Sequence, residues 1–129
     1  MGFNVNGTML FSRKTPGGVF TILDVAKVTG NIFYVDSTQT GVNGDTVGHG
    51  RSPDFPFATL DYAIGQCTEN QGDTILVAPL HAETHTTAGA VALDVRGITV
   101  IGIGQGAQRP KFTFTDAAAS WTVGAADIT

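Results

Sequence analysis

Cysteine, positive charge and long apolar runs are all scarce in this chain of 129 residues. Its single cysteine, Cys67, excludes a disulfide within the chain and a structural zinc site built on several cysteines. Seven Lys and Arg stand against eleven Asp and Glu, so the clustered positive charge that attracts nucleic acids and anionic membranes is missing. No apolar run approaches the roughly 20 residues that span a bilayer. We therefore expect a soluble chain with neither nucleic acid nor membrane as a partner.

Glycine, in contrast, is abundant and separates short β-branched segments. The chain has 17 glycines, nearly twice the usual share of about 7%. Short segments rich in Val, Ile, Thr and aromatic residues, each bounded by Gly, Pro, Asp or Asn, predict strands. These segments are residues 31–35, 73–78, 90–95, 97–102, 111–115 and 120–123. The composition predicts a mostly β domain.

Residues 59–69 alone have the period of an amphipathic helix. Their apolar positions recur at steps of three and four residues and are Leu60, Ala63, Ile64 and Cys67. Thr59 can cap the first turn, and Gly72 follows to end the helix. With the strands, this segment predicts a buried core made of Leu60, Ile64, Ile75, Val77, Val91, Leu93, Ile98, Val100 and Ile101.

The later strands are spaced like a repeat. Residues 97–102 align with residues 119–124, and residues 90–93 with residues 112–115, in both cases 22 positions later. Residues 75–77 precede residues 99–101 by 24 positions. A β-rich chain with such a period predicts a solenoid of about three coils. An ordinary β-sandwich is the alternative.

Four segments then follow one another in a distinctive order. They are Phe33-Tyr34-Val35-Asp36-Ser37, Phe57-Ala58-Thr59-Leu60 at the start of the helix, residues 72–79 and residues 97–102. This order resembles the start of right-handed parallel β-helix proteins of the pectate-lyase-like superfamily, over about residues 31–129. The resemblance implies an all-β fold, a right-handed parallel β-helix whose N-terminal end is capped by the short α-helix. The sequence departs from the family's pattern at residues 80–83. The resemblance leaves open whether the chain is a fragment of a longer protein.

The same superfamily holds lyases, hydrolases, epimerases and non-catalytic phage spikes, so the resemblance is poor at specifying activity. Residues 1–30 mix apolar residues with Asn and Gly and are interpreted as an extended docking arm. We expect a structural component of a phage particle, a spike, tail or capsid-decoration protein. It would be a homotrimer in the virion, attached to another virion protein through residues 1–30. A polysaccharide lyase or glycoside hydrolase is the alternative, and host surface carbohydrate is a further candidate partner.

Two aspartates are the weak catalytic candidates. Asp94 and Asp116 are 22 residues apart, so the repeat would stack them on adjacent coils about 4.8 Å apart. That spacing suits the carboxylate pair of a retaining glycosidase. Both also stand at strand ends, where Asp is a common turn residue.

His81, Glu83 and His85 are the weak metal candidates. An extended chain places them on one face as two histidines and a carboxylate. Because alternate side chains lie about 6.6 to 7 Å apart, three ligands would not reach one metal, and we interpret the face as polar and solvated.

Other motifs also have structural interpretations. Residues 102–107 match a dinucleotide fingerprint, but Arg109-Pro110 excludes the helix it needs, so we expect a glycine-rich turn and no cofactor. Asp36 and Asp45 lie in a loop without regular calcium-ligand spacing. Cys67 is expected to be a packed thiol. Trp121 is expected either inside the stack or on a carbohydrate-facing groove.

Overall fold

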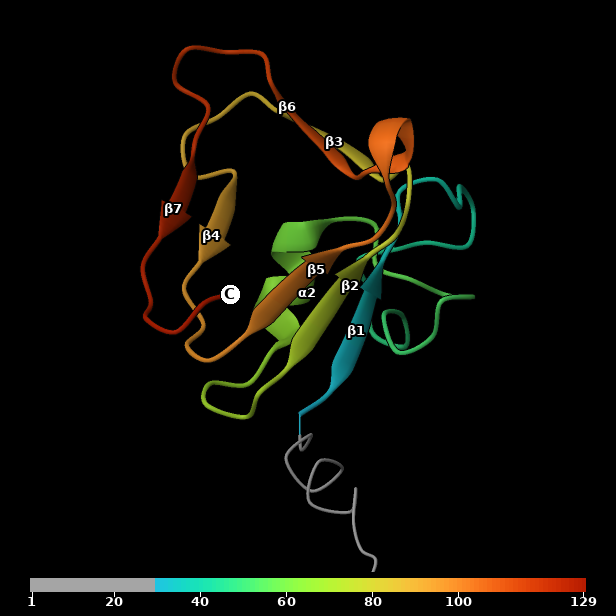
Figure 1. Cartoon of the computed structure of the whole chain (residues 1–129), viewed down its shortest axis with the longest axis vertical. Helices are drawn as coiled ribbons and strands as arrows, with labels where there is room; N and C mark the ends of the chain where they lie inside the picture. The colour runs from blue at the N-terminus through green and yellow to red at the C-terminus, as the bar shows by residue number, and fades with distance from the viewer. Residues whose placement is uncertain (1–29) are drawn as a thin grey trace, which may run out of the picture.

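The computed structural model describes residues 30–129, which form mostly strands with one short α-helix (Figure 1). The docking arm expected over residues 1–30 lies outside the described residues, apart from Gly30. The elements in chain order are β1 Ile32–Val35, α2 Leu60–Gln66, β2 Thr74–Val77, β3 Ala82–His85, β4 Val91–Leu93, β5 Thr99–Gly102, the 3-10 turn η1 Gly106–Gln108, β6 Lys111–Phe114 and β7 Trp121–Val123. In the described part no helix has the length and apolar character needed to cross a membrane.

The strands form three small parallel sheets. Their orders are β1-β2-β5, β3-β6 and β4-β7. In Figure 1 the three-stranded sheet lies in the centre, β3-β6 at the top and β4-β7 at the left. From β2 onward, consecutive strands of the chain belong to different sheets, and β5, β6 and β7 pair with β2, β3 and β4 in the same order. All six strands predicted from the sequence are present, and β3 is an additional one.

The predicted repeat of 22 residues is wrong. Thr74 pairs with Thr99, Ala82 with Lys111, and Val91 with Trp121, so the offsets are 25, 29 and 30 residues. Residues 90–93 therefore do not pair with residues 112–115. The turns between strands differ in length, so the strands do not recur at one fixed offset. Strands rich in Val and Thr also resemble one another at several alternative alignments, so sequence similarity between them does not identify the paired residues. A shift of one residue already exchanges the two faces of a strand.

Helix α2 begins where the sequence predicts and ends earlier. The Thr59 side chain accepts a hydrogen bond from the Tyr62 N–H, which caps the first turn. Leu60, Ala63 and Ile64 are buried against the strands. The helix ends at Gln66 with Cys67 as its C-cap, and the next N–H, that of Thr68, donates to the Asp73 carboxylate at 2.6 Å instead of continuing the helix.

The core lies between the sheets and α2. Six of the nine predicted core residues are buried, while Leu93 and Val100 are partly buried. Ile101 is 44% exposed, since it points to the outer face of β5 while its neighbour Val100 packs inward. The core also contains Phe33, Val35 and Phe57, which were not predicted.

A loop covers the outer edge of β1. The Tyr34 N–H donates to the Gly50 carbonyl, and the Phe57 N–H donates to the Tyr34 carbonyl, both at 2.8 Å. Gly50 has a φ of +82°, and a Cβ at this position would lie 2.0 Å from the Phe57 ring. Only glycine therefore allows the loop to close against this ring and to satisfy the edge of β1.

Candidate functional site

The three candidate metal ligands lie together in the interior. His81 and His85 are buried, and the Glu83 side chain is only 9% exposed. Strand β3 alternates, so Ala82 and Thr84 point to solvent while Glu83 and His85 point inward. The sequence placed these residues correctly on one face. The interpretation of that face as solvated is wrong.

Glu83 connects β3 with the start of α2. Its Oε2 accepts a hydrogen bond from the Leu60 N–H at 2.6 Å and lies 3.1 Å from His81 Nε2. The Ser37 N–H donates to His81 Nδ1 at 3.0 Å, so that nitrogen carries no proton. His81 is thereby assigned as the tautomer that donates from Nε2 to the Glu83 carboxylate. This chain of contacts fixes the loop after β1, strand β3 and helix α2 relative to one another.

His85 lies at the other oxygen of Glu83 and within a cluster of aromatic rings. Its Nε2 is 3.5 Å from Glu83 Oε1 but forms no hydrogen bond. The imidazole stacks on Phe112 with ring centroids 6.0 Å apart, and Phe114 and Trp121 contact it at 5.5 and 5.9 Å. Trp121 is partly buried and packs against the core. The indole Nε1 is also buried without a partner.

The cluster is suited to a structural role. Within residues 30–129, no three His, Cys, Asp or Glu side chains are arranged to hold a metal ion. Glu83 Oε2 and His81 Nδ1 are already used by backbone N–H groups. Burying a carboxylate requires such donors, because an unpaired buried charge costs several kcal/mol.

The observed register does not stack Asp94 and Asp116. Asp94 follows β4, and the Gly124 N–H beside it donates to the Leu93 carbonyl at 2.9 Å. Asp116 follows β6, which pairs with β3 in a different sheet. Its Oδ1 accepts from the Ala118 N–H at 2.9 Å, as in an Asx turn. The paired geometry expected of a retaining glycosidase is therefore not formed by these two residues.

The acidic loop uses its carboxylates internally. Asp45 accepts hydrogen bonds from the N–H groups of Ala58 and Thr59 and from the Thr59 hydroxyl. Burial by itself raises the pKa of Asp36, but hydrogen bonds from Thr38 and Gln39 outweigh it and hold this pKa below its ordinary value. Both carboxylates thus organise the segment that precedes α2.

The remaining motifs are also explained by the fold. Within the glycine-rich segment 102–107, only a three-residue 3-10 turn begins, so no helix is available for a pyrophosphate. Burial, together with the Asp73 carboxylate, raises the pKa of Cys67 to about 12. Its Sγ donates to the Ala63 carbonyl at 3.4 Å, so Cys67 is a packed thiol, as predicted.

Comparison of the chain with protein-family models, with curated proteins and with solved structures finds no match. Function must therefore be argued from the residues themselves.

Proposed function

We propose that the chain is a structural component of a phage particle and forms the first coils of a right-handed parallel β-helix. The observation that carries the fold is the order of pairing: β2, β3 and β4 are followed by β5, β6 and β7, each lying parallel beside its counterpart. Successive coils of one chain stacked on each other require this order. The right-handed sense is supported by the general handedness of crossovers between parallel strands, right-handed in about 98% of cases.

The covered edge of β1 supports the proposal that the stack starts here. The loop around residues 50–57 satisfies this edge, and α2 packs its apolar face against β1, β2 and β4. A stack that begins with a covered edge cannot be extended from that side by another chain.

The carboxylates and buried histidines favour a structural role over a catalytic one. Glu83 in the interior, Asp45 in the loop before α2 and Asp116 at the surface all accept backbone hydrogen bonds, and the inward histidines pack against aromatic rings. Catalysis requires groups that reach a substrate. The assignment to a particle comes from the resemblance of residues 31–129 to phage spikes and from the docking arm that the sequence predicts over residues 1–30.

Assembly and particle binding test this proposal. Light scattering of the full chain is expected to give three times the 13.4 kDa of one chain. Deleting residues 1–29 is expected to leave the β-rich circular dichroism spectrum unchanged and to abolish incorporation into particles. A stable monomer, or incorporation that survives the deletion, would contradict the proposal.

An assay for cleavage of capsular polysaccharides separates the enzyme alternative. We expect no release of reducing ends or unsaturated products. Cleavage that is lost in Asp94→Asn or Asp116→Asn would instead establish a lyase or glycoside hydrolase.

A further inference from the structure

The loop over residues 36–57, between β1 and α2, contains the pair Asn43-Gly44. Of the asparagines in the described part, which are Asn31, Asn43 and Asn70, only Asn43 is followed by glycine. A glycine has no Cβ to shield its backbone nitrogen, so this nitrogen can approach the preceding side chain closely. Asn43-Gly44 is therefore the place in the described part where an asparagine side chain can react with the backbone with the least steric hindrance.

That reaction is a deamidation, and water is its only co-reactant. The Gly44 nitrogen loses its proton to solvent and attacks the Asn43 Cγ, so that a new N–C bond forms. The bond from Cγ to the side-chain nitrogen breaks, and this nitrogen takes a proton from water and leaves as ammonia, which gives a succinimide ring. Water then opens the ring at either of its two carbonyls. The product at position 43 is aspartate or isoaspartate, and the chain gains one negative charge.

The closed loop holds both reacting groups in hydrogen bonds. The Gly44 N–H donates to the Pro56 carbonyl at 3.1 Å, which directs the attacking nitrogen away from the side chain. The Asn43 Nδ2 donates to the Asp36 carbonyl at 2.8 Å, and the Asn43 N–H donates to the Gln39 carbonyl at 3.0 Å. Attack on Cγ requires the side-chain bond to Asp36 and the Gly44 bond to break. The closed loop therefore protects the pair.

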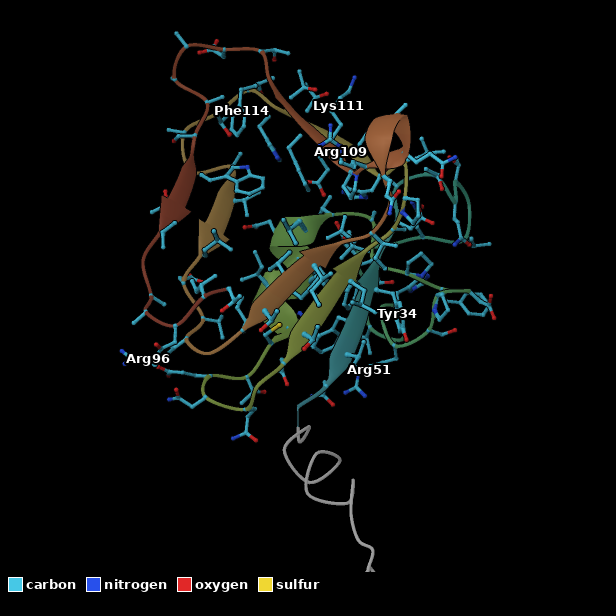
Figure 2. The ribbon with its side chains drawn as sticks, in the orientation of Figure 1. Tyr34, Arg51, Arg96, Arg109, Lys111 and Phe114 are labelled. Atoms are coloured by element: carbon cyan, nitrogen blue, oxygen red, sulfur yellow. The ribbon has the colours of Figure 1, made fainter. Side chains whose placement is uncertain are left out.

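One set of contacts holds this loop against the edge of β1. The Tyr34 N–H donates to the Gly50 carbonyl at 2.8 Å, and the Gly50 N–H donates to the Phe55 carbonyl at 2.7 Å. Figure 2 shows Tyr34 and Arg51 together at the side of the sheet that the loop covers. Phe55 is followed by Pro56, whose carbonyl binds Gly44, so loosening the loop at Gly50 also loosens the protection of Gly44.

The product of deamidation cannot restore the contact with Asp36. A carboxylate only accepts hydrogen bonds, and the Asp36 carbonyl is itself an acceptor, so the two oxygens repel each other. Asp36 also has a carboxylate of its own, which adds charge of the same sign. We therefore expect the loop to open more often after the reaction, which exposes the backbone groups at the edge of β1.

We propose that Asn43-Gly44 is a deamidation site, that the closed loop keeps it unreactive, and that its product no longer holds the loop against β1. The inference goes beyond the structural role in a particle and does not depend on it, because the reaction needs only this chain and water.

Peptide mass spectrometry of the full chain tests the protection. Trypsin releases residues 28–51, which contain Asn43, whereas the pair Asn6-Gly7 falls in a different peptide. Incubation in water labelled with heavy oxygen marks only the residues that react during the incubation. We expect Asn43 to deamidate at least about 10-fold more slowly in the folded chain than in the chain unfolded in urea, because the folded chain must first open locally. Equal rates would refute protection, and an unreactive Asn43 in urea would refute the site.

Matched glycine variants show whether opening of the loop limits the rate. Gly50→Ala should accelerate deamidation of the folded chain several-fold and leave the rate in urea unchanged. The control Gly65→Ala adds a Cβ that meets no atom within 4 Å and should change the folded rate by less than about 2-fold. In Gly44→Ala, the new Cβ lies 3.5 Å from His49 and fits, but it shields the attacking nitrogen, so we expect at least about 10-fold slower reaction even in urea.

A milder variant keeps this test decisive if Gly50→Ala does not fold, which circular dichroism reports. Gln39→Ala removes the side-chain hydrogen bonds to the Asp36 carboxylate and the Pro53 carbonyl and leaves the backbone carbonyl that Asn43 uses. It should also accelerate the folded reaction. If neither loop variant accelerates it, or if Gly65→Ala changes it as much as they do, the loop does not control the reaction and the proposal is overturned.

Hydrogen exchange of Asn43→Asp tests the effect of the product. We expect the Tyr34 amide, which is bound to the Gly50 carbonyl, to exchange at least about 5-fold faster than in the unmodified chain. The Ala63 amide in α2 should change by less than about 2-fold. Unchanged exchange at Tyr34, or equal acceleration at both amides, would contradict a product that opens the loop.

Discussion

Removing the Glu83 carboxylate is expected to destabilise the protein strongly. In Glu83→Ala, the Leu60 N–H and His81 Nε2 lose their shared acceptor, and both are buried or nearly so. Each unsatisfied buried donor costs about 1 to 3 kcal/mol, and the lost side chain leaves a void, so the free energy of unfolding should fall by about 3 to 5 kcal/mol.

A graded variant keeps the test informative even if Glu83→Ala does not fold. In Glu83→Gln, the amide oxygen can still accept from both donors, but the hydrogen bonds are no longer charge-assisted. We expect a loss of about 1 to 2 kcal/mol. Urea unfolding followed by circular dichroism measures both changes, and the amide exchange of Leu60 reports the helix start directly.

Glu69 provides the matched control. Its side chain is 61% exposed and lies 3.4 Å from Arg96, so Glu69→Ala should cost less than about 1 kcal/mol. If Glu83→Ala were no more destabilising than Glu69→Ala, the role of Glu83 as the link between β3 and α2 would be refuted.

Three further predictions concern other positions. Gly50→Ala should lower stability by about 2 to 4 kcal/mol in thermal unfolding, because its Cβ would lie 2.0 Å from Phe57 at a φ of +82°; an unchanged Tm would contradict this. Asp73→Ala should cost about 2 to 4 kcal/mol in urea unfolding, since the buried carboxylate accepts from the N–H groups of Asn31 and Thr68; a loss below about 0.5 kcal/mol would refute it. The pKa of Cys67 rises from 9.0 to about 12 in the folded protein, so the unfolded state releases its thiol proton at lower pH than the folded state does. The free energy of unfolding should therefore fall as the pH rises from about 9 to about 12. An equal dependence of the free energy of unfolding on pH in Cys67→Ala would exclude the thiol as its source.

Local signals predicted most of the elements but not their register. The apolar period and Thr59 identify the start of α2, and bounded β-branched segments identify six of the seven strands. Strand β3 was missed because its residues are Ala, Glu, Thr and His, and it forms only by pairing with β6. The register depends on the lengths of the turns between strands, and aligning similar strand sequences with one another gives no information about those lengths.

The interior cluster shows a similar limit. Alternation placed His81, Glu83 and His85 on one face, as the structure has them. Which face is buried depends on the Leu60 N–H, 23 positions away from Glu83 in sequence, and only the fold brings that donor to the carboxylate.

Disulfide trapping of the register between β3 and β6 tests the stacked-coil account most directly. Thr84 and Thr113 pair and point outward, so in a Cys67→Ala background the variant T84C/T113C places two thiols within disulfide reach, at a Cα separation of about 4.4 to 6.8 Å. We predict rapid formation of a disulfide within each chain, and slow or no cross-linking in T84C/T115C, whose second cysteine lies two residues out of register. Preferential cross-linking of T84C/T115C, or equal failure of both variants, would contradict the parallel stack.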